Sequence, residues 1–520
     1  MASNLDLIFK GNIITVVNQK PRVEAIGIKN GKIMSVGSAT EVEKGAGKAT
    51  RVLDLKGKTV LPGFIDSHAH PMGTGKNRLG VDLSSVKTVG EALEKIRQRV
   101  KKTPPGNLVF CPDYNRQHVV EKRYPSRKEL DSISTKHPIW IQHYDGHFSQ
   151  INSAAIVQLK LKAGMEGVIV DSKGQLTGLI QDPASARPLS DGDNFSDKTL
   201  AMKALMLVAK EAVSVGITTL FAKEGLENAE FIIKNVKKIP VRIHPMVFPG
   251  FGAATLDDVI NSKYLSDHIC VCNLTDGSVE GRTAALYEPY ADDPTTLGML
   301  HHTDDEFYCF IEKVHKAGCQ ISIHAESDRA IDQVLWAYEK VLEKYPRKDH
   351  RHRIEHFEVP TMKQINRVAR LGVILAMQPM FITVCEGPNL DYYRSLLGAE
   401  RVKRTHPFRS ILDEGIVVSG GSDTPVTKMN PLGGIHACVN HPTKEQRIDV
   451  YEAIEMFTIN GAKIGFEEDI KGSIEPGKLA DFVVLSDDPY RVLREKIEDI
   501  KVDMTIVGGK VVYDRKLNKI

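Results

Sequence analysis

The fold of this chain is indicated by one short stretch, Val60-Leu61-Pro62-Gly63-Phe64-Ile65-Asp66-Ser67-His68-Ala69-His70. The apolar run from Thr59 to Asp66 predicts a buried strand, and two histidines follow directly. Residues at positions i and i+2 of a strand point to the same side, so His68 and His70 can bind one ion together. A single His-x-His pair is weak evidence for a metal site, so further ligands must come from other parts of the chain.

Strands and helices alternate after this stretch. Apolar segments separated by helical patterns predict parallel strands that are buried on both faces. Eight such strands predict an α/β fold of the (β/α)₈ TIM-barrel type. A doubly wound open sheet is the alternative, but no Gly-x-Gly-x-x-Gly turn follows the first strand to favour it. The seven later strands are expected at 216–221, 241–247, 269–274, 320–324, 353–357, 372–377 and 416–420.

Both ends of the chain have the pattern of short strands and tight turns. Asn30-Gly31 and Gly508-Gly509 each lie between two apolar segments, which predicts two β-hairpins. Neither end has enough strands for a core of its own, so we expect one small β-sandwich built from residues 1–60 and 470–520. Two unrelated appendages are the alternative. The barrel then occupies 61–469, with a large insertion at about 76–200 after its first strand, over the face where functional loops lie.

The composition excludes several classes of protein. The 520 residues carry 69 Lys and Arg against 66 Asp and Glu, a net charge of +3, which is too even for an electrostatic nucleic-acid binder. No apolar run is long enough for a transmembrane helix, and the first residues lack the pattern of a secretory signal. Seven scattered cysteines fit a reducing compartment, and we expect a cytoplasmic protein.

Potential metal ligands stand where predicted strands end. His68 and His70 follow strand one, His324 ends strand five, His356 ends strand six and Asp423 follows strand eight. The carboxyl ends of barrel strands meet on one face, so these side chains should converge. Neutral imidazoles with a carboxylate are ligands typical of zinc. We therefore predict a divalent metal, with Zn²⁺ expected, as one or two ions.

These motifs resemble the amidohydrolase superfamily over nearly the whole chain. The stretch 60–70 is similar to the first-strand signature, and 474–482 is similar to the signature where the chain re-enters the small sandwich. Further motifs resemble the YtcJ-type branch, which includes N-substituted formamide deformylases. They are His143-Tyr144-Asp145-Gly146-His147, Asp276-Gly277-Ser278, Arg282-Thr283-Ala284-Ala285-Leu286 and Gly421-Ser422-Asp423-Thr424-Pro425.

One position departs from the pattern of this superfamily. Its members often carry a carboxylated lysine at the end of strand four, which bridges two metals, and Cys272 stands at the corresponding place here. A thiolate is a good zinc ligand, and some relatives resembling D-aminoacylase use a cysteine bridge, so Cys272 is our candidate bridging ligand. The alternative is a small buried side chain in a one-metal site. Lys223 is a weaker candidate bridge, and a surface or substrate-facing lysine is the more ordinary interpretation.

The resemblance implies hydrolysis of a C–N bond in an amide, N-formyl or N-acyl small molecule. A metal lowers the pKa of water, and Asp423 is expected to act as general base and then to protonate the leaving nitrogen. Asp423 could instead be a ligand only. Candidate substrate-binding residues are Tyr144, His147, Arg282 and Gln378. The alternative for Tyr144 and His147 is a hydrogen bond that fixes their loop, and for Arg282 it is an internal salt bridge.

Other functions stay open at this point, because a fold does not settle chemistry. The same metal site could hydrolyse esters, lactones or carbamates, or assist an isomerisation or decarboxylation. A non-catalytic binding protein is a third hypothesis, although such a protein does not need metal ligands on four strands. We expect no nucleic-acid or membrane partner, and the resemblance implies that the protein could form a homodimer.

Overall fold

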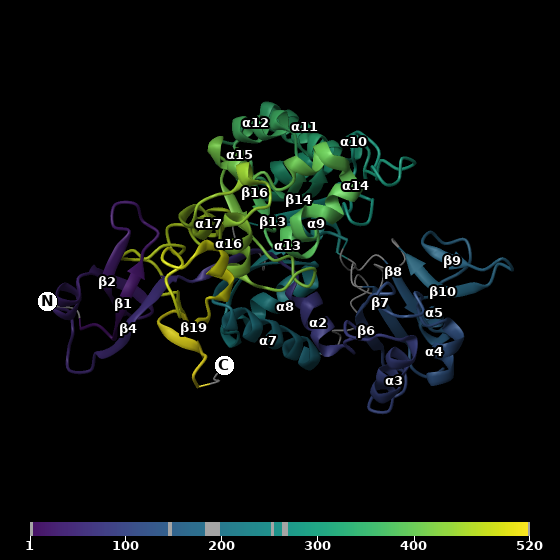
Figure 1. The fold of residues 1–520 in the computed structure, drawn as a ribbon, viewed down its shortest axis with the longest axis horizontal. Helices are drawn as coiled ribbons and strands as arrows, with labels where there is room; N and C mark the ends of the chain where they lie inside the picture. Colours follow the sequence, from purple (N-terminus) through teal and green to yellow (C-terminus); the bar gives the residue numbers. More distant parts are fainter. Residues whose placement is uncertain (1–3, 144–147, 182–197, 251–253, 263–268, 518–520) are drawn as a thin grey trace. The chain divides into compact units, whose positions relative to one another are not determined.

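The computed structural model describes residues 4–143, 148–181, 198–250, 254–262 and 269–517 (Figure 1). The chain divides into two compact units. The first comprises Met1–Ala69, Ala209–Pro249 and Thr255–Ile520, and the second comprises His70–Val208 and Gly250–Ala254. In the described part of the chain, no helix combines the length and the apolar character that a membrane span requires.

The first unit contains the predicted parallel barrel. Its eight-stranded sheet has the order β17-β16-β15-β14-β13-β12-β11-β5, and a bridge between Ala69 and Thr424 joins the first strand to the segment after the last. Every residue of β11 and β15 is buried, as expected for strands covered on both faces. The strands are β5 (Phe64–Ala69), β11 (Ile217–Glu224), β12 (Arg242–Val247), β13 (Cys270–Leu274), β14 (Gln320–Ser327), β15 (Arg353–Val359), β16 (Ile374–Met377) and β17 (Val418–Gly420).

The predicted first barrel strand is wrong in one respect, because it is two strands. β4 (Arg51–Pro62) belongs to another sheet, and β5 begins after Gly63. At Gly63 the backbone N–H donates to Asp481 O at 2.9 Å, and a Cβ would lie 2.3 Å from the Thr218 side chain. The close approach of Thr218 therefore requires glycine at the point where the chain leaves one sheet for the other.

Helices of the first unit begin and end where local sequence dictates. In α10 the cap Thr303 and Glu306 form a capping box, and Phe307, Ile311 and Val314 place apolar side chains on one buried face. The α-helices are α1 (Ala39–Glu43), α8 (Leu226–Asn235), α9 (Leu256–Ile260), α10 (Asp304–Lys316), α11 (Asp328–Lys344), α12 (Met362–Leu371), α13 (Phe381–Val384), α14 (Asp391–Arg401), α15 (Phe408–Asp413), α16 (Pro431–Val439), α17 (Val450–Met456) and α18 (Ile459–Lys463). Short 3₁₀ helices are η1 (Val236–Lys238), η2 (Pro388–Leu390), η3 (Val402–Arg404), η4 (Lys444–Gln446) and η5 (Arg494–Asp499).

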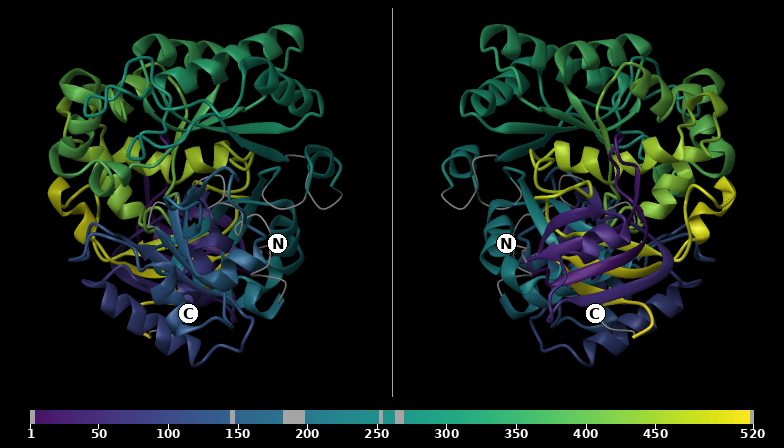
Figure 2. Two further views of the ribbon diagram at one scale, coloured as in Figure 1. Left: turned by 90° about the vertical axis from the view of Figure 1, so that its right-hand side faces the viewer. Right: turned by 90° about the vertical axis from the view of Figure 1, so that its left-hand side faces the viewer.

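The two ends of the chain meet in one continuous seven-stranded sheet, with N-terminal strands in purple beside C-terminal strands in yellow (Figure 2). β4 pairs with β1 in parallel and with β18 in antiparallel orientation, which joins the ends. Both predicted hairpins are present, and Asn30 and Gly31 have φ of 51° and 73°. The remaining strands are β1 (Leu7–Ile14), β2 (Arg22–Lys29), β3 (Lys32–Gly37), β18 (Phe482–Leu485), β19 (Val502–Val507) and β20 (Lys510–Asp514).

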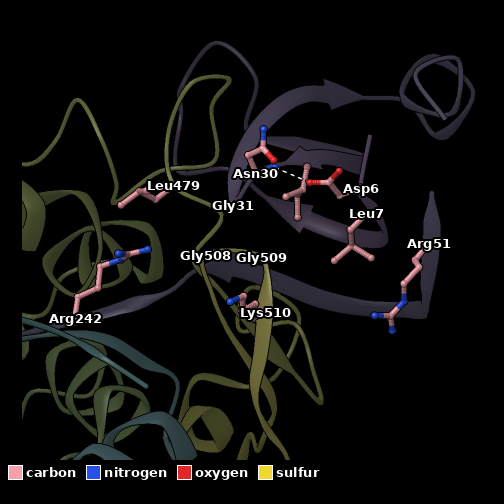
Figure 3. Close-up of a pocket in the computed structure, with 11 residues that line it drawn as sticks. Asp6, Leu7, Asn30, Gly31, Arg51, Arg242, Leu479, Gly508, Gly509 and Lys510 are labelled. Atoms are coloured by element: carbon pink, nitrogen blue, oxygen red, sulfur yellow. Dashed lines mark hydrogen bonds between the residues drawn. The ribbon is translucent and has the colours of Figure 1, made fainter. Parts of the chain in front are cut away.

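The two hairpin turns lie against each other, since a Cβ on Gly31 would be 3.0 Å from Gly508 O. A cavity of about 640 Å³ lies beside them (Figure 3). Its charged lining residues are Asp6, Arg51, Arg242 and Lys510, of which Arg242 is held by Asp481 at 2.7 Å. This cavity is lined by none of the predicted metal ligands that the structure describes.

The second unit is a small α/β body with a sheet of its own, which the sequence did not predict within the insertion. The strand order is β6-β7-β8-β10-β9, and Leu83, Ile96, Val109 and Ile141 are among its core residues. The strands are β6 (Val109–Tyr114), β7 (Ile139–His143), β8 (Phe148–Ile151), β9 (Val168–Val170) and β10 (Leu176–Gln181). The helices are α2 (Pro71–Leu79), α3 (Val89–Val100), α4 (Arg127–Ile133) and α5 (Ser153–Gln158), and α7 (Lys198–Ser214) leads back to β11.

Candidate metal centre

The first and last barrel strands bring His68 and Asp423 together. Asp423 N donates to His68 O at 2.8 Å, and His68 Nε2 lies 3.1 Å from Asp423 Oδ1. Asp423 adopts φ of 54°, a left-handed conformation that is uncommon for a residue with a side chain. Potential ligand atoms of His68, His70 and Asp423 all lie within 4.8 Å of one another. The predicted convergence of these three residues is therefore present, although His70 caps α2 rather than extending the strand.

A second group of potential ligands lies on β14 and β15. It comprises His324, Glu326 and His356, whose ligand atoms are also within 4.8 Å of one another. The ring centroid of His356 is 4.3 Å from that of His324 and 4.9 Å from that of His68. The two groups therefore adjoin. Glu326 is a residue that sequence reasoning missed, and the signal for it was its position two residues after His324 on the same strand.

Hydrogen bonds orient the rings of two of these histidines. His324 Nε2 lies 3.0 Å from the carbonyl oxygen of Gly277, and His68 Nδ1 lies 2.6 Å from Glu355 Oε2. Both oxygens only accept, so those nitrogens carry protons; His324 Nδ1 then keeps a lone pair for an ion, whereas His68 Nε2 faces the Asp423 carboxylate at 3.1 Å. Burial lowers the pKa of His324 to about 4, which keeps its imidazole neutral at neutral pH. This arrangement fits a metal ion whose histidine ligands are oriented by neighbouring oxygens.

The carboxylate that orients His68 is held by buried cations and a hydroxyl group. Arg353 is fully buried and forms an ion pair with Glu355, with Arg353 Nη2 at 3.1 Å from Glu355 Oε2. Ser322 Oγ donates to Glu355 Oε1 at 2.7 Å, and Lys223 Nζ lies 3.6 Å from Glu355 Oε2. Burial raises the pKa of Glu355, but Arg353, Lys223 and His68 together hold it well below its usual range. Glu355 is therefore a carboxylate hydrogen-bonded to the ring of a candidate ligand.

Cys272 lies outside both ligand groups of the described residues. It is fully buried on β13 and packs in a cluster with Ile65, Phe221 and Met246. Burial raises the pKa of its thiol, but a hydrogen bond with Cys270 and the charge of Lys223 lower it to about 7. The structure therefore places Cys272 in the barrel core without joining it to the histidines.

The other predicted site residues fall in different places. Gln378 is fully buried, and its Nε2 lies 3.3 Å from His68 Nδ1. Lys223 is 4% exposed, so the interpretation of a surface lysine is wrong. Arg282 forms an ion pair with Asp292, which is the structural alternative considered for it. Tyr144 and His147 lie outside the described residues.

Additional buried carboxyl groups surround Glu326. Tyr393 Oη lies 2.7 Å from Glu358 Oε2 and 3.0 Å from Glu280 Oε1. Because a phenol has one proton to donate, it cannot donate to both acids at once. Burial, Glu280 and Glu386 raise the pKa of Glu358 well above its usual range. Several carboxyl groups are therefore buried near one another at this end of the barrel.

The sequence of the chain was compared with protein families and with individual known proteins. A family model described as the amidohydrolase family matches residues 51–513. The chain is 28% identical to the amidohydrolase YtcJ of Bacillus subtilis, with 97% of this chain and 98% of that protein covered. It is also 28% identical to the N-substituted formamide deformylase of Arthrobacter pascens, with 98% of each covered.

A solved structure supports the same fold. It is the metal-dependent hydrolase of Pyrococcus horikoshii, which matches with a TM-score of 0.78 and 25% identity over 94% of this chain and 99% of the other. These comparisons confirm the resemblance predicted from the sequence. The chain therefore belongs to the amidohydrolase family and is a metal-dependent hydrolase that acts on carbon–nitrogen bonds.

Proposed function

We propose that the chain hydrolyses the C–N bond of an amide, N-formyl or N-acyl small molecule, with zinc as its metal. The observation that carries this proposal is the convergence of His68, His70 and Asp423 beside His324 and His356, which come from four strands of the barrel. A divalent ion bound by imidazole and carboxylate groups supplies Lewis-acid polarisation and an activated water. The formamide deformylase among the relatives supports the choice of an N-acyl substrate.

Asp423 is the proposed general base. The residue is 7% exposed, and its carboxylate lies beside His68, where it can accept a proton from the attacking water. The same carboxyl group can then deliver this proton to the leaving nitrogen, which departs as an amine. The left-handed backbone at Asp423 and its N–H bond to His68 O fix the carboxylate in this place.

Gln378 and Arg282 have limited support as substrate-binding residues. The amide of Gln378 is fully buried beside His68 Nδ1, on the ring edge that faces Glu355, so its contact is with a candidate ligand rather than with the open side of the metal centre. Arg282 already has a carboxylate partner in Asp292, and a substrate carboxylate would have to compete with it.

The test is a panel of N-formyl amines, N-acyl amino acids and matched esters, assayed with zinc-loaded and chelated protein. The proposal predicts zinc-dependent release of the amine. Hydrolysis of the esters without any amide hydrolysis would contradict it, as would equal activity of the chelated protein.

A further inference from the structure

We propose that the cavity beside the two hairpin turns binds a small organic anion, either a phosphate ester or a carboxylate. The cavity measures about 640 Å³, and all of its lining residues belong to the first unit (Figure 3). Its lining combines strands from both ends of the chain with Arg242 of the barrel. A volume of this size falls within the range of about 300–1,000 Å³ that is typical of small-molecule sites.

The cavity and the metal centre lie at opposite ends of the barrel. Arg242 is the first residue of β12, which runs parallel to β11 and β13. His68 lies at the carboxyl end of β5, and Asp423 follows β17. The carboxyl ends of parallel barrel strands meet on one face, so the first residue of a strand lies toward the other face. A ligand beside Arg242 therefore leaves the metal centre unoccupied.

Positive charge dominates the polar lining of the cavity. Arg51, Arg242 and Lys510 line it together with a single carboxylate, that of Asp6. Asp6 is already engaged, since its Oδ2 accepts a hydrogen bond from Asn30 N at 2.6 Å. Within the described part of the chain, the side chains of Arg51 and Lys510 form no ion pair and no hydrogen bond. Cations gathered around one hollow repel one another, and an anion between them relieves this repulsion.

Arg242 is fixed by an internal partner and keeps donors for a ligand. Its Nε and Nη2 donate to Asp481 Oδ2 and Oδ1 at 2.7 Å and 3.0 Å, and Gly508 N donates to Asp481 Oδ1 at 2.7 Å. A guanidinium group has five N–H donors, so this pairing leaves three of them available. Because Asp481 offsets the charge of Arg242, the net positive charge of the cavity comes from Arg51 and Lys510, which are both exposed to solvent.

The rest of the lining fits an organic anion better than an inorganic one. Leu7, Ile28 and Leu479 contribute apolar side chains. Gly31 and Gly509 have φ of 73° and 75° and carry no side chain, so the backbone of the two turns borders the cavity directly. Apolar walls with a few charged groups are typical of sites for organic ligands. Such a ligand contacts both ends of the chain at once, so its binding should also stabilise the fold.

The test is calorimetric titration of the zinc-loaded, full-length protein with phenyl phosphate and with phenylacetate, which place different anionic groups on an apolar ring. Inorganic phosphate tests the need for the ring, and benzyl alcohol tests the need for the charge. We expect at least one of the two organic anions to bind, more tightly than inorganic phosphate, and benzyl alcohol not to bind. Tighter binding of phenyl phosphate assigns the site to phosphate esters, and tighter binding of phenylacetate assigns it to carboxylates.

Two controls separate this site from the zinc ion, which also attracts anions. The double substitution Arg51→Gln and Lys510→Gln should weaken binding by about tenfold, because it removes two charge-assisted contacts. Lys516→Gln is the matched control, since it removes an exposed lysine of the same chain end that does not line the cavity, and it should bind as the wild type does. The zinc-free protein should also keep the binding.

Circular dichroism of each variant checks the fold. The proposal is overturned if neither organic anion binds, if the folded double variant binds as tightly as the wild type, or if binding disappears with the zinc.

Discussion

Glu355 offers the sharpest test of how the centre is organised. The substitution Glu355→Gln keeps the size of the side chain but removes the charge that accepts the His68 Nδ1 proton at 2.6 Å. His68 then loses the partner that fixes its ring, and the loss of such an outer partner lowers metal affinity about 10–100-fold. The measurement is competitive zinc titration against a chelator of known affinity.

The same substitution also affects stability. Arg353 is fully buried, and Glu355 is its carboxylate partner, so removing this charge leaves an uncompensated guanidinium group. Breaking a buried ion pair from one side costs about 3–5 kcal/mol. Asp481→Asn is the matched control, because it breaks the Arg242–Asp481 pair and touches none of the proposed ligands. The reasoning is refuted if Glu355→Gln is destabilised but binds zinc as tightly as Asp481→Asn does.

Three further predictions concern the turnover of a variant, stability at acid pH and removal of the metal. Asp423→Asn should retain most of its zinc but lose about 10²–10⁴-fold in kcat, as expected for loss of a general base, and near-wild-type turnover would contradict that role. Burial lowers the pKa of His350 and, more strongly, of His352, so folding disfavours the protonation of both imidazoles. The unfolded chain takes up protons below about pH 6.5, so stability is complete above this pH and should fall below it, by at most about 1.4 kcal/mol per pH unit for each histidine. Urea unfolding at pH 7.5 and 5.5 measures this fall, which His352→Asn should reduce, and a midpoint that does not change with pH would argue against it. Dialysis against dipicolinate should abolish amide hydrolysis, and zinc should restore it; activity that survives complete zinc removal would contradict the mechanism.

The barrel could be predicted because each strand leaves a local signal. β16 is a short apolar run between helical segments, and such runs are recognisable without any tertiary information. The break at Gly63 could not be predicted, because it depends on the approach of Thr218 from a distant part of the chain. Apolar residues continue through this point, so the two strands resemble one in sequence.

The candidate site was predictable only where its residues end strands. His68 is the next-to-last residue of β5 and Asp423 follows β17, and barrel topology brings them together. The prediction that His324 and His356 end their strands is wrong, because β14 continues to Ser327 and β15 to Val359. The role of Glu355 was hidden, since it depends on Ser322 and Lys223 from two other strands. The partner of Arg282 was equally hidden, because ion pairing across a loop leaves no periodic signal.

The most direct test of the account is an anomalous-scattering map from crystals of the zinc-loaded protein, collected on both sides of the zinc absorption edge. We predict a zinc peak in contact with His68, His70 and Asp423. Zinc bound only elsewhere in the molecule, with these three side chains free of metal, would contradict the central claim.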